Sequence, residues 1–136
     1  MIKPYILFNR NCDEAVNMYV KAFDGEIISM QKYSDMPENP DFPITEDMKN
    51  LVIHSCIKLT EEGYIFASDS QQDYPASEKV VISLQLDSEE KARKAWDILK
   101  IDGKVHMELA PAFFSDLHGS VQDKYGVTWM FTVGQR

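Results

Sequence analysis

The chain has 136 residues, a length that suits one domain with one moderate core. Hydrophobic residues make up 44% and charged residues 26%, which are ordinary values for a soluble globular protein. The formal net charge of −8 argues against nucleic acid and anionic membrane as partners, because both are negatively charged and attract Lys and Arg instead.

The sequence has few features that indicate a cellular compartment. The spacing of Cys12 and Cys56 matches no zinc or redox motif. The first fifteen residues do not have the pattern of a signal peptide, and no apolar run approaches the roughly 20 residues that span a bilayer. We therefore expect a cytoplasmic protein with reduced thiols.

The first half of the chain predicts the order β-α-β-β-β. A helix is expected over residues 12–23, where apolar side chains recur at helical spacing, and Asn11 is expected to cap it. The predicted strands of this half cover residues 4–9, 26–33, 51–59 and 64–70.

Residues 34–50 differ from their surroundings. Three prolines and several acids make a regular helix or strand a poor fit. We expect a long, solvated surface loop, with a lid as the alternative, because long loops in compact domains are often functional or mobile.

The second half repeats the order of the first. A helix is expected over residues 88–100, with Asp87 as its cap. The predicted strands cover residues 79–87, 104–109, 115–123 and 126–133. The sequence therefore predicts an α+β fold of two βαβββ units, about 1–72 and about 78–136. We expect one curved eight-stranded mixed sheet with the helices on its outer face.

Alternation in three strands predicts an apolar face and a partly polar face. In residues 51–59 the apolar set is 51, 53, 55, 57 and 59, and the other set includes Val52, His54 and Cys56. Ser83 and Met130 fall on the partly polar faces of their strands, whereas Trp129 falls on the apolar face. If the apolar faces meet the helices, the polar faces line a concave groove that suits a small ligand.

His54 and Cys56 are the leading polar candidates, because both side chains point to the same side of one strand. They could bind a metal or act as a base and a thiolate nucleophile. We favour a groove-lining or structural histidine and a small buried cysteine, because the sequence places no third ligand or orienting carboxylate beside them.

Two other regions offer candidates. Asp69 ends an apolar strand, and we favour a hydrogen bond to backbone amides over a role as a base or polar anchor in the groove. Phe113 and Phe114 lie in a connection and are predicted to form a groove wall. Trp129 is predicted to pack in the core.

Three stretches together resemble a known family. They are PYILFNRNCDEAVNMYVKAFDGE, FASDS and GSVQDKYGVTWMF. In this order they resemble the PhnB-like branch of the glyoxalase/bleomycin-resistance (vicinal oxygen chelate) superfamily, often labelled 3-demethylubiquinone 3-methyltransferase-like. The resemblance implies a single domain over residues 1–136, built from paired βαβββ units, and a homodimer that covers exposed strand edges.

Metal-dependent members of this superfamily present one His or Glu from each of four strands. The matching positions here are Pro4, Asp69, Val80 or Val81, and Met130. Proline and valine carry no donor, and a thioether suits copper better than the hard divalent ions of this superfamily. The resemblance therefore implies a protein without the metal site, and we expect no cofactor.

The sequence thus predicts a protein that binds a small organic molecule in a groove, with unknown catalytic residues. The predicted ligand-binding residues are His54, Cys56, Asp69, Ser83, Phe113 and Met130. The alternatives are a divalent-metal-dependent lyase, isomerase or dioxygenase, an antibiotic-sequestering resistance protein, and a pure interaction protein. A methyltransferase would need a site for S-adenosylmethionine, and no glycine-rich strand-to-helix turn is found.

Overall fold

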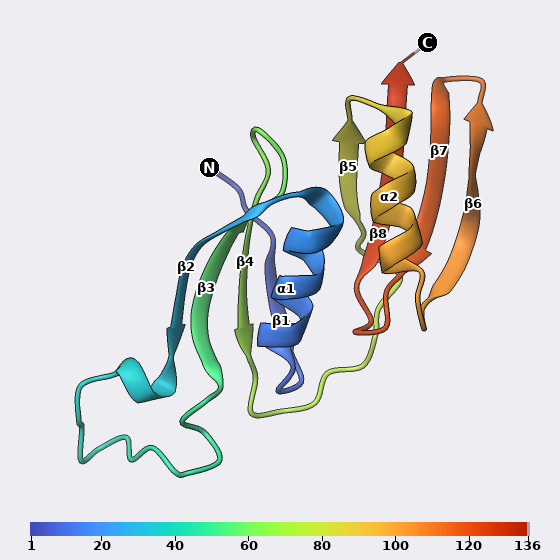
Figure 1. Cartoon of the computed structure of the whole chain (residues 1–136). Coiled ribbons are helices and arrows are strands. Elements are labelled where there is room, and N and C mark those ends of the chain that lie inside the picture. The colour runs from blue at the N-terminus through green and yellow to red at the C-terminus, as the bar shows by residue number, and fades with distance from the viewer. Residues whose placement is uncertain (136) are drawn as a thin grey trace. The chain divides into compact units, whose positions relative to one another are not determined.

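The structure, a computed structural model, describes residues 1–135 and contains two βαβββ repeats (Figure 1). One compact unit comprises residues 1–20 and 24–74, and the other comprises residues 21–23 and the described chain from residue 75 onward. We call these unit 1 and unit 2. The α+β class and the repeated element order are confirmed, with the eight strands in two sheets of four. No helix of residues 1–135 is long and apolar enough to cross a membrane.

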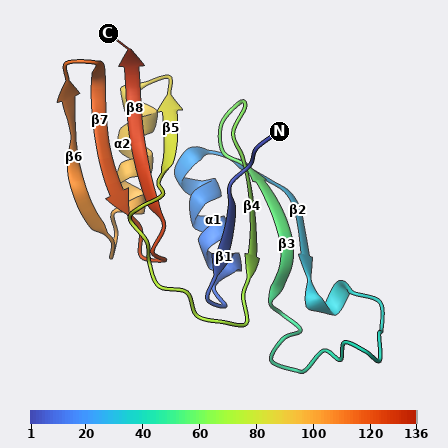
Figure 2. The same cartoon turned by 180° about the vertical axis from the view of Figure 1, so that it is seen from behind.

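Unit 1 consists of one helix and a four-stranded sheet. Its elements are β1 (Tyr5–Phe8), α1 (Cys12–Phe23), β2 (Glu26–Lys32), β3 (Val52–Lys58) and β4 (Tyr64–Asp69), with a short 3-10 turn at Tyr33–Asp35. The last three residues of α1 are grouped with unit 2. The strand order is β1-β4-β3-β2, in which β1 runs parallel to β4 and the other pairs are antiparallel. Helix α1 lies over one face of this sheet, and Tyr19 packs against Phe8 (Figures 1 and 2).

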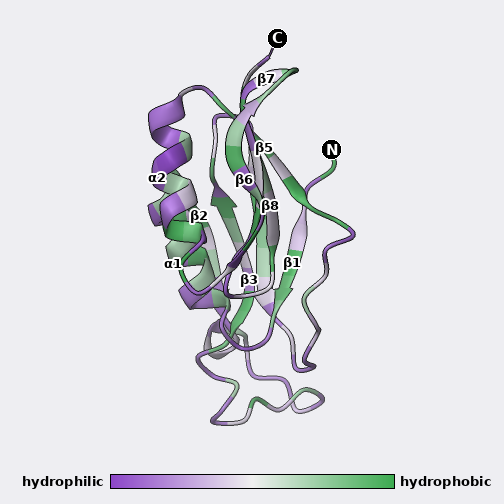
Figure 3. Cartoon of the chain, turned by 90° about the vertical axis from the view of Figure 1, so that its right-hand side faces the viewer, coloured by the Kyte–Doolittle hydropathy of each residue, from purple (hydrophilic) through white to green (hydrophobic). Residues whose placement is uncertain are grey.

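Unit 2 repeats the arrangement. Its elements are β5 (Ile82–Leu86), α2 (Glu89–Leu99), β6 (Lys104–Ala112), β7 (Ser115–Gln122) and β8 (Thr128–Gln135). The strand order is β5-β8-β7-β6, again with one parallel pair, β5 and β8. The hydrophilic residues of α2 lie on the side turned away from the strands (Figure 3), while Trp96 meets Phe131 edge-on at 5.4 Å. Trp129 is fully buried, which confirms its predicted place in the core.

Strand β3 departs from the predicted alternation at its start. Val52, predicted on the partly polar face, is fully buried, whereas Ile53 is partly exposed. The pairing with β2 explains this, because Gln31 faces His54 but Lys32 faces Val52, so that Ile53 is an extra residue. Such a bulge shifts every side chain before it by one position. Beyond the bulge the predicted alternation holds.

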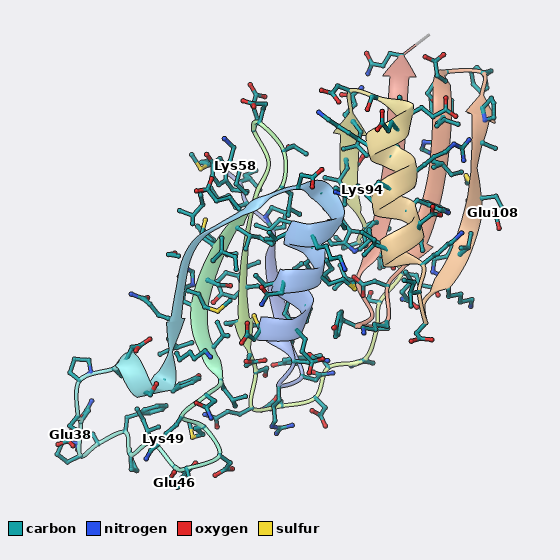
Figure 4. The ribbon with its side chains drawn as sticks, viewed as in Figure 1. Glu38, Glu46, Lys49, Lys58, Lys94 and Glu108 are labelled. Carbon is teal, nitrogen blue, oxygen red and sulfur yellow. The ribbon has the colours of Figure 1, made fainter. Side chains whose placement is uncertain are left out.

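Residues 34–50 form the predicted surface loop. Its base is tied by backbone hydrogen bonds from Tyr33 N to Leu51 O (3.0 Å) and from Ser34 N to Lys49 O (3.1 Å). Glu38 and Glu46 point outward from the loop (Figure 4), in keeping with solvated acids. A lid function for this loop stays a prediction.

The two helix starts correct the predicted caps. Within residues 1–135 the Asn11 side chain makes no capping hydrogen bond, and its buried Oδ1 has no hydrogen-bond partner. The first amide of α1, Cys12 N, instead donates to Asp69 Oδ1 at 2.9 Å. Helix α2 is capped by Ser88 and not by Asp87, since Ser88 Oγ accepts from Lys91 N at 3.1 Å. Both predictions failed because a cap depends on the backbone angle of the residue as well as on its type.

Candidate functional site

The sheet of unit 1 has one face under α1 and an opposite face that carries no helix of this unit, which Figure 2 shows in front of α1. We call this opposite side the open face of unit 1. Because cross-strand partners point to the same side of a sheet, the register groups its residues in three rows. They are a lysine row (Lys3, Tyr64 and Lys58), an aromatic row (Tyr5, Phe66 and Cys56) and a polar row (Leu7, Ser68 and His54).

A hydrogen-bonded group links β1, β3 and β4 on this open face. The Tyr5 hydroxyl donates to Ser68 Oγ at 3.1 Å and lies 3.4 Å from His54 Nδ1. Because a phenol has one proton, the Tyr5 oxygen must accept from His54 Nδ1–H if it donates to Ser68. With Tyr5 as the donor to Ser68, His54 is the tautomer protonated at Nδ1, and its Nε2 is an acceptor.

The same histidine belongs to a cluster of rings. The His54 ring centroid lies 5.8 Å from that of Tyr5 and 5.1 Å from that of Phe66, and Tyr5 meets Phe66 edge-on at 6.1 Å. Tyr5 is 48% exposed, so the cluster is accessible in unit 1. Partly exposed rings beside hydrogen-bonding groups can hold an organic ring and fix its orientation.

Two lysines stand at one end of this cluster, where the N-terminal residues pass the β3–β4 turn (Figure 1). Lys3 Nζ lies 5.0 Å from the Tyr64 ring centroid and 4.7 Å from that of Phe66. Lys58, labelled in Figure 4 at the end of β3, lies 5.9 Å from the same Tyr64 ring. Within residues 1–135 neither lysine forms an ion pair.

Asp69 lies on the helix-facing side. It is 6% exposed, its Oδ1 accepts from Cys12 N, and its Oδ2 accepts from Val52 N at 2.8 Å. The carboxylate thus holds the starts of α1 and β3 against the end of β4. These bonds support the structural role that the sequence favoured, and Asp69 is not carried into the proposal as a ligand-binding residue.

The two cysteines lie in different surroundings. Cys12 is fully buried, and burial, together with the nearby charge of Asp69, raises the pKa of its thiol from 9.0 to about 12. Its thiol is therefore protonated and inert at neutral pH. Cys56 lies on the open face and is partly exposed, rather than fully buried.

The sheet of unit 2 also has a face opposite its helix, which we call the open face of unit 2. Ser83 and Met130 are register partners on this face, so the structure brings these two predicted residues together. His118 lies on the same face, with its Nδ1 3.2 Å from Thr132 Oγ1. Sequence reasoning gave His118 no role, although its alternation with Leu117 in the β7 segment could have placed it here.

Phe113 does not line either open face. It is 91% exposed at the β6–β7 turn and meets Phe114 edge-on at 5.4 Å. Phe114 is the residue that reaches the open face of unit 2, because its ring lies 4.8 Å from that of His118. The groove wall predicted for Phe113 and Phe114 stays a prediction, with Phe114 the one of the two that contacts a residue of an open face.

The residues at the four metal-ligand positions do not fit a divalent ion. Pro4 has no donor, both oxygens of Asp69 already accept backbone amides, and Val80 is 79% exposed ahead of β5. Met130 offers a thioether, a poor ligand for a hard ion. Within residues 1–135, no three His, Cys, Asp or Glu side chains gather closely enough to hold a metal.

Known proteins resemble this chain over nearly its whole length. The model of a family described as 3-demethylubiquinone-9 3-methyltransferase matches residues 1–132. The chain is 27% identical over 145 residues to protein YjdN of Escherichia coli, covering 97% of this chain and 94% of YjdN.

Solved structures of other proteins also resemble this chain over nearly all of its residues. Protein PA1353 of Pseudomonas aeruginosa is 30% identical, with a TM-score of 0.83 over 100% of this chain and 98% of PA1353. The PhnB protein of Bacillus cereus is 26% identical, with a TM-score of 0.78 over 98% of each chain. The fosfomycin resistance protein FosX of Listeria monocytogenes shares the fold alone, at 10% identity and a TM-score of 0.65 over 99% of this chain and 93% of FosX.

Proposed function

The chain belongs to the 3-demethylubiquinone-9 3-methyltransferase family, in the PhnB-like branch of the vicinal oxygen chelate superfamily, and from this premise we propose that it binds a small organic molecule on the open face of unit 1. The binding uses side chains alone, without the divalent ion of metal-dependent members. His54 and Cys56, predicted from the sequence, take part together with Tyr5, Phe66 and Ser68.

One observation carries the proposal. Tyr5, His54 and Phe66 come from three strands and form a contiguous group of rings, with a hydroxyl and an imidazole nitrogen at one side. Ligand sites in proteins combine apolar or aromatic walls with a few polar groups that fix orientation. A ring placed against Phe66 would gain stacking and apolar contact, and a polar substituent would reach His54 Nε2.

The open face of unit 2 is the natural internal control. It carries a histidine on β7, the strand that corresponds to β3. The cross-strand neighbour of this histidine is Thr132, and a ring in contact with it, that of Phe114, comes from the β6–β7 turn and not from a neighbouring strand. The proposal therefore assigns binding to unit 1 and makes His118 a matched comparison for His54.

A thermal-shift screen of small aromatic compounds tests the proposal. Compounds that stabilise the wild-type protein should lose about tenfold in affinity in His54→Ala and in Phe66→Ala, because each change removes a direct contact. The His118→Ala variant should bind as the wild type does. If His118→Ala abolishes binding while His54→Ala and Phe66→Ala leave it intact, the assignment to unit 1 is wrong.

The homodimer predicted from the resemblance stays a prediction. Native mass spectrometry of protein purified from its own host would report the assembly mass together with any retained small molecule.

A further inference from the structure

We propose that the open face of unit 1 recognises an aromatic carboxylate, whose ring lies on the aromatic row, whose carboxylate lies at the lysine row, and whose opposite end carries a hydrogen-bond donor to His54. This inference names the ligand class for the proposed function and rests on it. Three observations carry it: the charge of the face, the closeness of Phe66 to both Lys3 and His54, and the acceptor nitrogen of His54.

The charge of the open face is opposite to that of the chain. The chain has a net charge of −8, yet none of the nine residues of the three rows is acidic, and two are lysines. Glu26 on β2 is the register partner of Lys58 but forms no ion pair with it within residues 1–135. A cationic end on an acidic protein favours an anionic ligand group.

The two lysines flank one ring. Lys3 Nζ and Lys58 Nζ lie 5.0 Å and 5.9 Å from the Tyr64 centroid, so both lie at the same end of the face. Tyr64 stands on β4, the strand between β1 and β3, so the ring lies between the two side chains. An anionic group bound at this row is attracted by both ammonium groups and accepts a hydrogen bond from the nearer one.

The aromatic row lies between the lysine row and the polar row. Phe66 is a neighbour of both, because Lys3 Nζ lies 4.7 Å and the His54 ring centroid lies 5.1 Å from its ring centroid. A ligand ring placed against Phe66 therefore has an ammonium group and an imidazole close to it, which suits a ring with a carboxylate at one end and a hydrogen-bond donor at the other.

The polar row favours a ligand with a hydrogen-bond donor at the end opposite its carboxylate. Since the Tyr5 hydroxyl donates to Ser68 and accepts from His54 Nδ1–H, the remaining ring nitrogen Nε2 accepts. A hydroxyl on the ligand can donate to it, whereas an ether or a carbonyl at this position has no proton to give.

The test compares 4-hydroxybenzoate with its neutral, nearly isosteric amide, 4-hydroxybenzamide, by calorimetric or NMR titration at low salt. The acid should bind the wild-type protein about fivefold more tightly than the amide, a difference expected from two partly exposed ion pairs. In the Lys3→Gln/Lys58→Gln double variant this ratio should fall to about one. Lys124→Gln is the matched control, because Lys124 Nζ also lies over a ring, that of Tyr125 at 5.3 Å, but in the β7–β8 turn.

The outcomes separate this inference from the proposed function. If the acid and the amide bind equally and both depend on Phe66, or if neither binds while the screen finds other Phe66-dependent ligands, the carboxylate assignment is overturned and the proposed function stands. If no compound of any charge depends on Phe66, both fail. A preference for the acid that persists in the double variant also contradicts the role of the two lysines.

Discussion

The two units share a fold but differ in the chemistry of their open faces. Both have the strand order of a βαβββ repeat, and both bury large side chains between helix and sheet. The open face of unit 1 gathers rings from neighbouring strands and two lysines, whereas that of unit 2 presents Ser83, Met130 and Thr132, with Phe114 beside His118. The comparison teaches that core packing fixes the helix-facing side of each repeat, while the opposite side is free to diverge in chemistry.

The units also differ in how each uses a buried carboxylate. Asp69 of unit 1 accepts buried amides from residues 57 and 17 positions away, which joins three separate elements. Asp123 of unit 2 accepts from Tyr125 N, Val127 N and Trp129 Nε1, all within six residues. Unit 1 therefore relies on one carboxylate for its long-range arrangement, whereas unit 2 uses one for a local turn.

The largest expected effect comes from Asp69→Ala. It should lower the free energy of unfolding by about 3 kcal/mol, because it leaves two fully buried amides without an acceptor. Asp123→Ala should have a smaller effect, since of the three donors named above only Trp129 Nε1 is buried, while the two turn amides are partly buried and can reach water. Urea denaturation measures both variants. An Asp69→Ala variant as stable as the wild type would show that the carboxylate does not hold unit 1 together.

The second-largest expected effect is a loss of stability at high pH that comes from the thiol of Cys12 at the start of α1. Burial first, and then the charge of Asp69, raise the pKa of Cys12 to about 12 from 9.0. Between these values the unfolded chain loses its thiol proton and the folded chain keeps it, so the free energy of unfolding falls as pH rises above 9. At pH 10 this loss amounts to about 1.4 kcal/mol.

The measurement is the stability difference between the wild type and Cys12→Ala at pH 8 and pH 10. The difference should shrink by about 1.4 kcal/mol at the higher pH, because the variant lacks the thiol. Cys56→Ala is the control, with a thiol removed from the open face of the same unit. A constant difference for Cys12→Ala would contradict the raised pKa.

The smallest expected changes in stability come from substitutions at the N-terminal ends of the two helices. Ser88→Ala should destabilise the protein by about 1 kcal/mol, because it removes the hydrogen bond to Lys91 N. Asn11→Ala should leave stability unchanged or slightly higher, since its side chain makes no cap and its buried Oδ1 is unpaired. Equal losses in the two variants would mean that Asn11 caps α1 in solution.

Sequence periodicity predicted what depends on local spacing. The helix over residues 12–23 was predicted with its observed bounds, because a regular apolar face identifies it. The bulge at Ile53 could not be predicted, since it arises from pairing with β2. The role of Tyr5 was also missed, because its contacts with His54 and Ser68, 49 and 63 residues away, exist only through the parallel pairing of β1 with β4.

The most direct test of the proposed site is to map where an aromatic carboxylate binds on the protein. Two-dimensional nitrogen–proton NMR of the labelled protein, titrated with 4-hydroxybenzoate and separately with its amide, follows both open faces at once. The account predicts saturable shifts in the amide signals of Tyr5, His54 and Phe66, with those of Ser83 and Met130 unmoved. Saturable shifts confined to Ser83 and Met130, or no saturable shift in either sheet, would contradict it.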